Sequence, residues 1–239
     1  MVRFVVALAT LLSVVSPISA FPLNARWLLN HGQHWVDLWT AQPSAASGSL
    51  TGALNNTAGI LFNTTIRQTL RVGLQADEIR IRVSNAFGNQ ALNITSVTVA
   101  YPGNSLNSNA NGTNTGTGSP FIIPESLKTV TFSGNETISL PNGALGVSDP
   151  ICLPVKAQSQ LSVSIYLATG QGGLNITGHL TSQTDSWFGF GDQTSAYNIT
   201  GANVTSADQW YFISAVEGWL SADASAFAIV GDSITDGVG

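Results

Sequence analysis

Apolar and polar residues alternate along much of the chain, which is the pattern of β-strands with one buried face. In residues 66–74, Ile66, Leu70 and Val72 are separated by polar positions, and residues 79–84 read Ile-Arg-Ile-Arg-Val-Ser. A period of two places successive side chains on opposite faces of a strand, so each segment predicts a half-buried strand with a polar face. Shorter alternating segments recur at residues 97–101, 130–132 and 161–167.

The spacing of these segments predicts an all-β fold. Long helical periodicity is missing between residues 44 and 207, and turn residues separate the apolar runs. We therefore expect an antiparallel, jelly-roll-like β-sandwich over residues 21–223, with residues 210–220 as a last long strand. Residues 102–120 are almost entirely Gly, Ser, Asn and Thr, which predicts a flexible surface loop between two strands.

The pattern changes after residue 223. Residues 226–230 read Ala-Phe-Ala-Ile-Val, a continuous apolar run typical of strands buried on both faces in parallel α/β sheets. Residues 224–239 are therefore expected to begin a second, α/β domain. A parallel strand needs neighbours on both sides, so this short segment is expected to be poorly ordered or loosely docked on the sandwich.

The N-terminus has the layout of a secretory signal peptide. Arg3 is followed by an apolar run over residues 4–15 and by small and polar residues that end at Ala20. The alternative is a buried N-terminal helix. The run is too short to span a bilayer, and no later stretch is long and apolar enough to do so. We expect cleavage after residue 20 and a secreted protein.

The low content of charged residues limits the kinds of molecule that this protein can be expected to bind. Charged residues make up 9% of the chain and the net charge is −5, whereas typical globular proteins have roughly 25% charged residues. With no basic patch, the sequence argues against nucleic-acid binding. Glycans would supply the hydration that charge does not, because eight Asn-x-Ser/Thr sequons follow the signal peptide: Asn55, Asn63, Asn93, Asn111, Asn135, Asn175, Asn198 and Asn203.

Cys152 is the single cysteine, so a disulfide within the chain is excluded. It is either a small buried apolar residue or a thiol whose partner lies elsewhere. No cofactor or metal site is indicated. Residues 232–237 faintly resemble a calcium loop, but they lack its alternating acidic ligands and its final glutamate.

The segment Gly-Asp-Ser-Ile-Thr-Asp-Gly over residues 231–237 is the strongest candidate for chemistry. Ligands of open α/β sheets bind at the carboxyl ends of strands, and Ser233 would follow such an end. Gly231 permits a tight exit from the strand, while Asp232 and Thr235 can hydrogen-bond to nearby backbone. A serine is a weak nucleophile until a base, normally histidine, takes its proton, and the oxyanion also needs donors.

The segment "AIVGDSITDGVG" resembles the first block of the GDSL (SGNH) family of serine esterases and lipases. The resemblance extends from about residue 35 to residue 239. Six further segments resemble, in order, the N-terminal β-domain of one secreted branch of that family: "WVDLWTAQP", "IRQTLRV", "IRIRVSNAFG", "SLKTVTFSG", "SDPICLPV" and "WYFISAVEGW".

The resemblance implies that Ser233 is the nucleophile and that its own backbone N–H contributes to the oxyanion hole. Asp232, with Gly231, would support the turn and not act as the acid of the triad. The family's oxyanion glycine, oxyanion asparagine and late Asp-x-x-His follow the serine, and none of them occurs within these 239 residues. The implied substrate is a carboxylic ester, with acylated carbohydrate, short-chain ester and lipid ester all open.

Residues before the serine offer no substitute base. His31, His34 and His179 match no catalytic position of the family, and we expect structural or solvated roles for them. Residues 189–195 imitate the motif, but Gln193 stands where the serine would be, which indicates a loop. Most tryptophans are expected to pack in the core or between domains, with a sugar-stacking platform as the alternative: Trp27, Trp35, Trp39, Trp187, Trp210 and Trp219.

Three hypotheses follow. The first is that the chain is the N-terminal part of a secreted serine esterase whose gene model or natural product is cut short. Alternatively, it is a non-catalytic, glycosylated β-sandwich that serves as a binding or accessory module, with the motif as a remnant. The third hypothesis is a structural surface protein. Under each, the 239 residues alone are predicted to be inactive as an esterase, because the base is missing.

Overall fold

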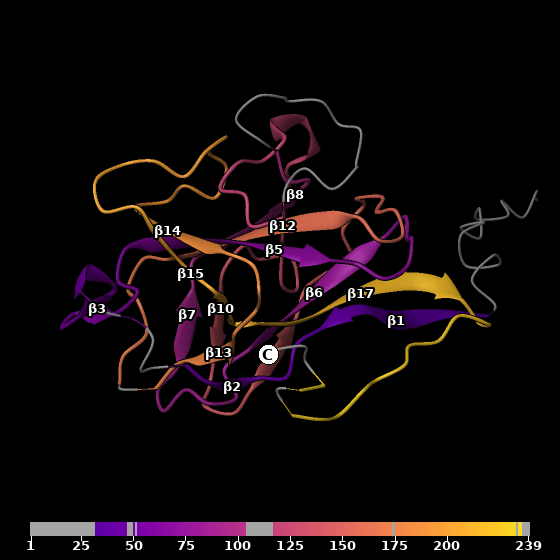
Figure 1. Cartoon of the computed structure of the whole chain (residues 1–239), viewed down its shortest axis with the longest axis horizontal. Coiled ribbons are helices and arrows are strands. Elements are labelled where there is room, and N and C mark those ends of the chain that lie inside the picture. The colour runs from indigo at the N-terminus through magenta and orange to yellow at the C-terminus, as the bar shows by residue number, and fades with distance from the viewer. Residues whose placement is uncertain are drawn as a thin grey trace, which may run out of the picture. The chain divides into compact units, whose positions relative to one another are not determined.

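The protein is mainly β, with antiparallel sheets, in a computed structural model that describes residues 32–46, 50, 52–103, 117–173, 175–232 and 234–235. Figure 1 shows the strands as layered sheets joined by loops. The expected signal peptide and loop residues 104–116 lie outside the described residues, as do Trp27, His31, Asn111 and Ser233. The antiparallel β-sandwich predicted from the alternation is confirmed.

The larger sheet has six strands in the order β15-β14-β5-β12-β8-β9. At its centre, β5 and β12 pair along their whole lengths, from Thr64 opposite Leu167 to Arg71 opposite Gln160. The strands are β5 (Thr64–Arg71), β8 (Ser96–Ala100), β9 (Lys128–Thr129), β12 (Gln160–Leu167), β14 (Ser186–Phe190) and β15 (Thr205–Ala207). The strands expected near residues 66–74, 97–101 and 161–167 are thereby confirmed.

The second sheet has four strands in the order β1-β17-β6-β11. They are β1 (Gln33–Thr40), β6 (Ile79–Ser84), β11 (Leu145–Val147) and β17 (Ile213–Ser221). Along β6, Ile79, Ile81 and Val83 are buried, while Arg80 and Arg82 are half-buried on the opposite face. This is the alternation that the sequence predicts for residues 79–84.

In the part of the chain that the structure describes, three smaller sheets and two short helices accompany the two large sheets. A three-stranded sheet has the order β16-β13-β2, and two-stranded sheets pair β10 with β7 and β3 with β4. Their bounds are β2 (Ser44–Ala45), β3 (Asn55–Asn56), β4 (Gly59–Ile60), β7 (Leu92–Ile94), β10 (Ile138–Leu140), β13 (Thr177–Leu180) and β16 (Gln209–Tyr211). Two single-turn 3-10 helices in the described residues are η2 (Gly52–Leu54) and η3 (Pro124–Ser126).

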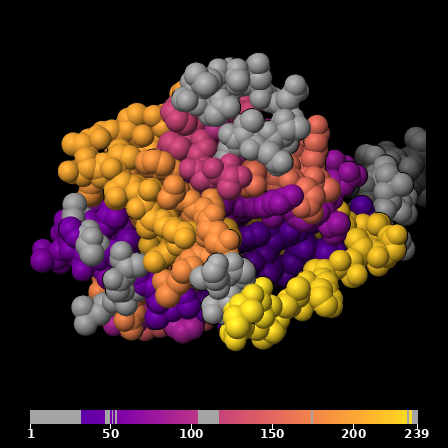
Figure 2. Space-filling view, in the orientation of Figure 1, coloured from indigo at the N-terminus to yellow at the C-terminus, as the bar shows by residue number. Residues whose placement is uncertain are grey.

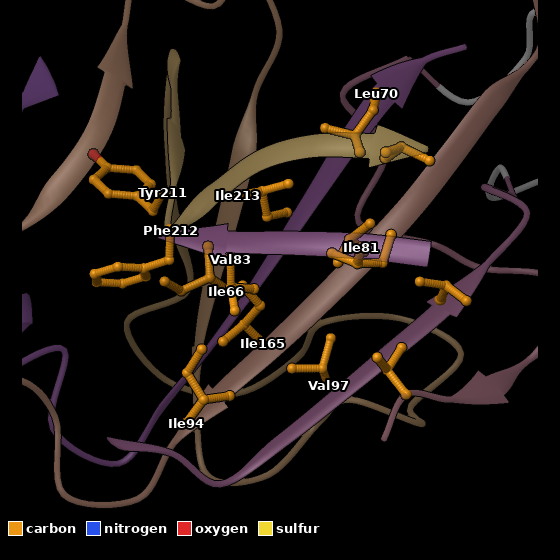
Figure 3. Close-up of a cluster of buried hydrophobic side chains, with 14 of the residues drawn as sticks. Ile66, Leu70, Ile81, Val83, Ile94, Val97, Ile165, Tyr211, Phe212 and Ile213 are labelled. Carbon is orange, nitrogen blue, oxygen red and sulfur yellow. The ribbon is translucent and has the colours of Figure 1, made fainter. Parts of the chain in front are cut away.

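The core lies between the inner faces of the two large sheets. Branched side chains from β5, β6, β8 and β12 meet there with aromatic residues that precede β17. Figure 3 shows this cluster around Ile66, Ile81, Val97, Ile165 and Phe212. Because β-branched residues pack well on a pleated surface, the alternating apolar positions that define the strands also build this core.

Two expectations about individual strands are wrong. The polar face of β5 does not meet solvent, because Thr65, Arg67 and Thr69 are buried under the protein's own loops. The last apolar stretch is also not one strand. Phe212, with φ of 61°, separates β16 from β17, and this left-handed backbone turns the chain from one sheet into the other.

One further expected strand does not form, and the C-terminal segment expected to be poorly ordered or loosely docked contains no strand in its described residues. Residues 130–132 contribute only an isolated bridge between Phe132 and Asn135. Residues 226–230 lie in coil, and Phe227, Ile229 and Val230 are between 70% and 89% exposed. A strand of the parallel type needs hydrogen-bonding neighbours, and the described residues supply none to this segment.

Candidate functional site

The candidate catalytic block follows β17 at the C-terminal side of the described chain. Ser233 itself lies outside the described residues. On either side of it, the Asp232 carboxylate accepts a hydrogen bond from the Ile234 N–H at 3.0 Å. A Cβ on residue 231 would lie 2.1 Å from Thr235 Oγ1, so this local turn requires glycine at that position unless the threonine moves.

Apolar side chains surround this block without cover from the described residues. Phe227, Val230 and Ile234 are each more than 80% exposed. In Figure 2 the yellow residues that follow β17 form a narrow strip along one side of the molecule. Such a run of exposed apolar residues differs from the scattered single ones of an ordinary soluble surface.

The two histidines among the described residues have distinct surroundings. His34 is exposed on β1. His179 is half-buried on β13, with Nδ1 2.9 Å from the Gln42 carbonyl oxygen. Its ring also lies 5.7 Å from the ring of Trp210. The contacts of His179 are those of a residue that joins β13 to its neighbours.

The loop that imitates the catalytic motif is held in place by its glutamine. Gln193 donates through Nε2 to the Thr200 carbonyl and accepts from the Thr200 N–H, both at 2.8 Å. Its own N–H donates to Thr65 Oγ1 at 2.9 Å. Residues 191–195 form a loop, as the sequence indicates, while Phe190 ends β14.

Arg67 is the buried charged group that the sequence did not reveal. Its side chain is fully buried, donating from Nε to Ser164 Oγ and from the guanidinium to the carbonyls of Pro120, Gln193 and Thr194. Burial lowers the pKa of Arg67 to about 10. The ion pairs of the described residues do not include it. The guanidinium therefore anchors two loops over β5 through neutral acceptors.

A charged cluster occupies the outer face of the four-stranded sheet. Glu217 is buried and pairs with both Arg80 and Arg82. Asp37 lies 3.5 Å from Arg82, and desolvation by burial raises the pKa of this carboxyl against the opposing effect of the arginine. The signal for this cluster was a single glutamate in an apolar strand opposite alternating arginines.

The tryptophans on this face do not form a flat platform. The rings of Trp35 and Trp219 lie 5.1 Å apart with planes at 55°. The Arg80 guanidinium lies over the Trp35 ring at 4.4 Å and covers that ring face. Trp39, also on β1, meets Trp210 of β16 in the three-stranded sheet edge-on at 4.8 Å. The five described tryptophans are all half-buried, so none is a fully buried core residue, although Trp39 and Trp210 pack against the core.

Cys152 is exposed, so the interpretation as a small buried apolar residue is wrong. Its Sγ lies 3.9 Å from Glu78 Oε2. The residue follows Ile151, which bridges to Ile79 and points inward. Alternation along this extended segment therefore turns the cysteine outward.

The described sequon asparagines are all accessible to some degree. Asn63 and Asn198 are half-buried, and five are exposed: Asn55, Asn93, Asn135, Asn175 and Asn203. They lie on β3, on β7 and in loops, and none is on a strand of the four-stranded sheet.

No helix in the described part of the chain is long and apolar enough to cross a membrane. The described residues also include no group of three or more His, Cys, Asp or Glu side chains placed to hold a metal ion. In comparisons with known proteins, no family model matches the sequence and no curated protein is similar to it.

Proposed function

We propose that this chain is the N-terminal part of a secreted carboxylic-ester hydrolase of the GDSL (SGNH) type, with Ser233 as its nucleophile. The observation that carries the proposal is the order of motifs. Six segments that resemble the β-domain of this family precede a Gly-Asp-Ser block, which directly follows an apolar run. A short motif alone occurs by chance in many turns, whereas an ordered series is specific.

In this reaction Ser233 Oγ attacks the ester carbonyl carbon, and the alcohol leaves as an acyl-enzyme forms. The Ser233 backbone N–H would donate to the oxyanion. Asp232 supports the turn through its hydrogen bond to the Ile234 N–H. The proton of the serine must pass to a base, and neither exposed His34 nor His179, which contacts Gln42 and Trp210, is a match for that role.

The substrate class within this proposal is a carboxylic ester: an acylated carbohydrate, a short-chain acyl ester or a lipid ester. The leader-like residues 1–20 and the eight sequons support an extracellular setting. An α/β domain beginning near residue 224 would cover the exposed apolar side chains of Phe227 and Val230.

A second candidate is a non-catalytic, glycosylated binding or accessory module. One observation favours it: the two large sheets enclose a continuous apolar core to which none of the described residues after 223 contributes. A β-sandwich whose core is buried by its own residues can fold and act as an independent module.

Esterase assays on the 239-residue chain test the need for a base. We expect its turnover of a short-chain aryl ester to equal that of Ser233→Ala, because loss of the serine or its histidine costs on the order of 10⁶ in kcat in a comparable hydrolase. Turnover well above the Ser233→Ala control would show that a base lies within these residues.

Sequencing the transcript past the Gly239 codon separates the two candidates. An open frame with Asp-x-x-His supports the hydrolase, and the chain extended through it should lose activity on Ser233→Ala. A stop codon at that point supports the accessory module.

A further inference from the structure

Two of the three exposed aromatic side chains in the described part of the sandwich belong to residues that directly precede a sequon asparagine. Phe62, Phe87 and Tyr197 are 38%, 44% and 42% exposed. Phe62 directly precedes Asn63 and Tyr197 directly precedes Asn198. The N–H of Phe87 donates to Oγ1 of Thr177, the last residue of the Asn175 sequon, at 2.9 Å. In the described part of the chain, the remaining exposed aromatic residue is Phe227, beyond the sandwich.

The two asparagines that follow an exposed aromatic residue have their amide oxygens turned toward the protein. Asn63 Oδ1 accepts a hydrogen bond from the Tyr166 hydroxyl at 2.8 Å. Asn198 Oδ1 is buried, although the residue as a whole is half-exposed. Because Oδ1 and Nδ2 diverge from the same carbon, Nδ2 of each residue points away from the groups that surround its Oδ1.

Backbone hydrogen bonds and a ring contact hold the loop that carries Tyr197 and Asn198. The Tyr197 carbonyl accepts from the Ile122 N–H at 2.9 Å, and Asn198 forms a β-bridge with Phe121. The Phe121 and Tyr197 rings meet edge-on at 5.3 Å. The loop between β14 and β15, orange on the left of Figure 1, thus presents Tyr197 and Asn198 from a backbone anchored on both sides.

We propose that Asn63 and Asn198 carry N-linked glycans whose first sugar packs on Phe62 and Tyr197. This inference rests on the secretory route of the proposed function and adds a structural role for the glycan. In the modification, Nδ2 bonds to the anomeric carbon of a lipid-diphosphate-linked oligosaccharide. The bond from that carbon to the diphosphate oxygen breaks, its electron pair leaves with the diphosphate, and the amide gives up one proton. The C–H face of the sugar is apolar and covers the ring.

Occupancy is tested first. The chain with its own residues 1–20 is expressed in a eukaryotic secretory host, and glycopeptides are mapped by mass spectrometry. Secretion with glycan on Asn63 and Asn198 is expected. Retention of the chain inside the cell overturns the secretory route and this inference with it. A secreted chain without glycan on either residue overturns the inference alone.

The packing is tested by the melting temperature of the secreted protein. Thr200→Ala removes the Asn198 sequon at an exposed side chain and should lower Tm by about 2–4 °C. Thr137→Ala removes the Asn135 sequon, whose aromatic neighbour Phe132 is buried and offers no exposed ring, and should leave Tm unchanged. In a Tyr197→Ser background, Thr200→Ala should have no further effect.

Two controls distinguish the sugar contact from an effect on the fold. An endoglycosidase that leaves the first sugar in place should not change Tm. Thr200→Ala should also be neutral in chain made without glycans in bacterial cytosol. An equal loss of Tm in the unglycosylated chain, or an equal effect of Thr137→Ala and Thr200→Ala, would overturn the packing.

Discussion

Replacing Arg67 by lysine tests whether a buried charge anchored only to neutral acceptors stabilises this fold. The guanidinium makes four hydrogen bonds, between 2.7 and 3.3 Å long, to Ser164 and to the carbonyls of Pro120, Gln193 and Thr194. Hydrogen bonds to a charged group contribute about 1.5–3 kcal/mol each. Burial opposes this, because it lowers the pKa of Arg67 to about 10, and a fall of that size corresponds to a cost of about 3 kcal/mol at neutral pH.

Lysine keeps the buried charge but cannot reproduce the planar fork of donors. With at least two of the four bonds lost, we expect Arg67→Lys to lower the free energy of unfolding by about 3 kcal/mol. Arg67→Met removes the charge as well, and the three carbonyls keep the donors Ile199 N–H, Ala196 N–H and Thr98 Oγ1. Arg67→Met should therefore be less destabilising than Arg67→Lys.

Urea unfolding followed by tryptophan fluorescence measures these differences. Arg71→Lys is the matched control, because Arg71 ends the same strand and is exposed. It should change stability by less than about 0.5 kcal/mol. If Arg67→Lys is as stable as the wild type, the hydrogen bonds do not carry the stability assigned to them. If Arg67→Met is the least stable variant, the burial cost of the charge has been overstated.

Three further predictions concern other parts of the chain. Glu217→Gln should destabilise the fold by about 1–3 kcal/mol in urea unfolding, because it leaves Arg80 and Arg82 without their shared carboxylate; an unchanged midpoint would contradict this. Hydrogen bonds, first from a threonine side chain and then from two backbone N–H groups, lower the pKa of Asp149. The hydrogen-bonded Asp149 carboxylate stabilises the fold above pH 3.8, the ordinary pKa of the carboxyl, and this stabilisation is lost as the pH falls below that value. The decrease in the free energy of unfolding caused by Asp149→Asn should therefore be seen at pH 6 and become smaller at lower pH. In hydrogen exchange, the Ile229 amide should exchange rapidly in the monomer, since it lies in exposed coil; strong protection would argue for a docked strand.

The candidate site was recognisable only in part from sequence. The sequence block over residues 231–237 has a short-range pattern, so the roles suggested for Gly231 and Asp232 could be predicted from neighbouring residues. The surroundings of His179 could not, because its contact with Gln42 joins residues that are 137 positions apart. The same holds for Cys152, whose exposure depends on which strand the segment beside it pairs with.

The sequence by itself determined the strands, because a period of two in side-chain polarity is a local property. It marked β5, β6 and β12 and the class of fold that they build. Tertiary structure decided how the polar positions are used. Arg67 and Arg80 look alike in alternating segments, yet loops from residues 117–121 and 191–195 bury the first, while the second stays at the surface beside Glu217. Loop packing and strand pairing bring together residues that are distant along the chain, and no local pattern records that.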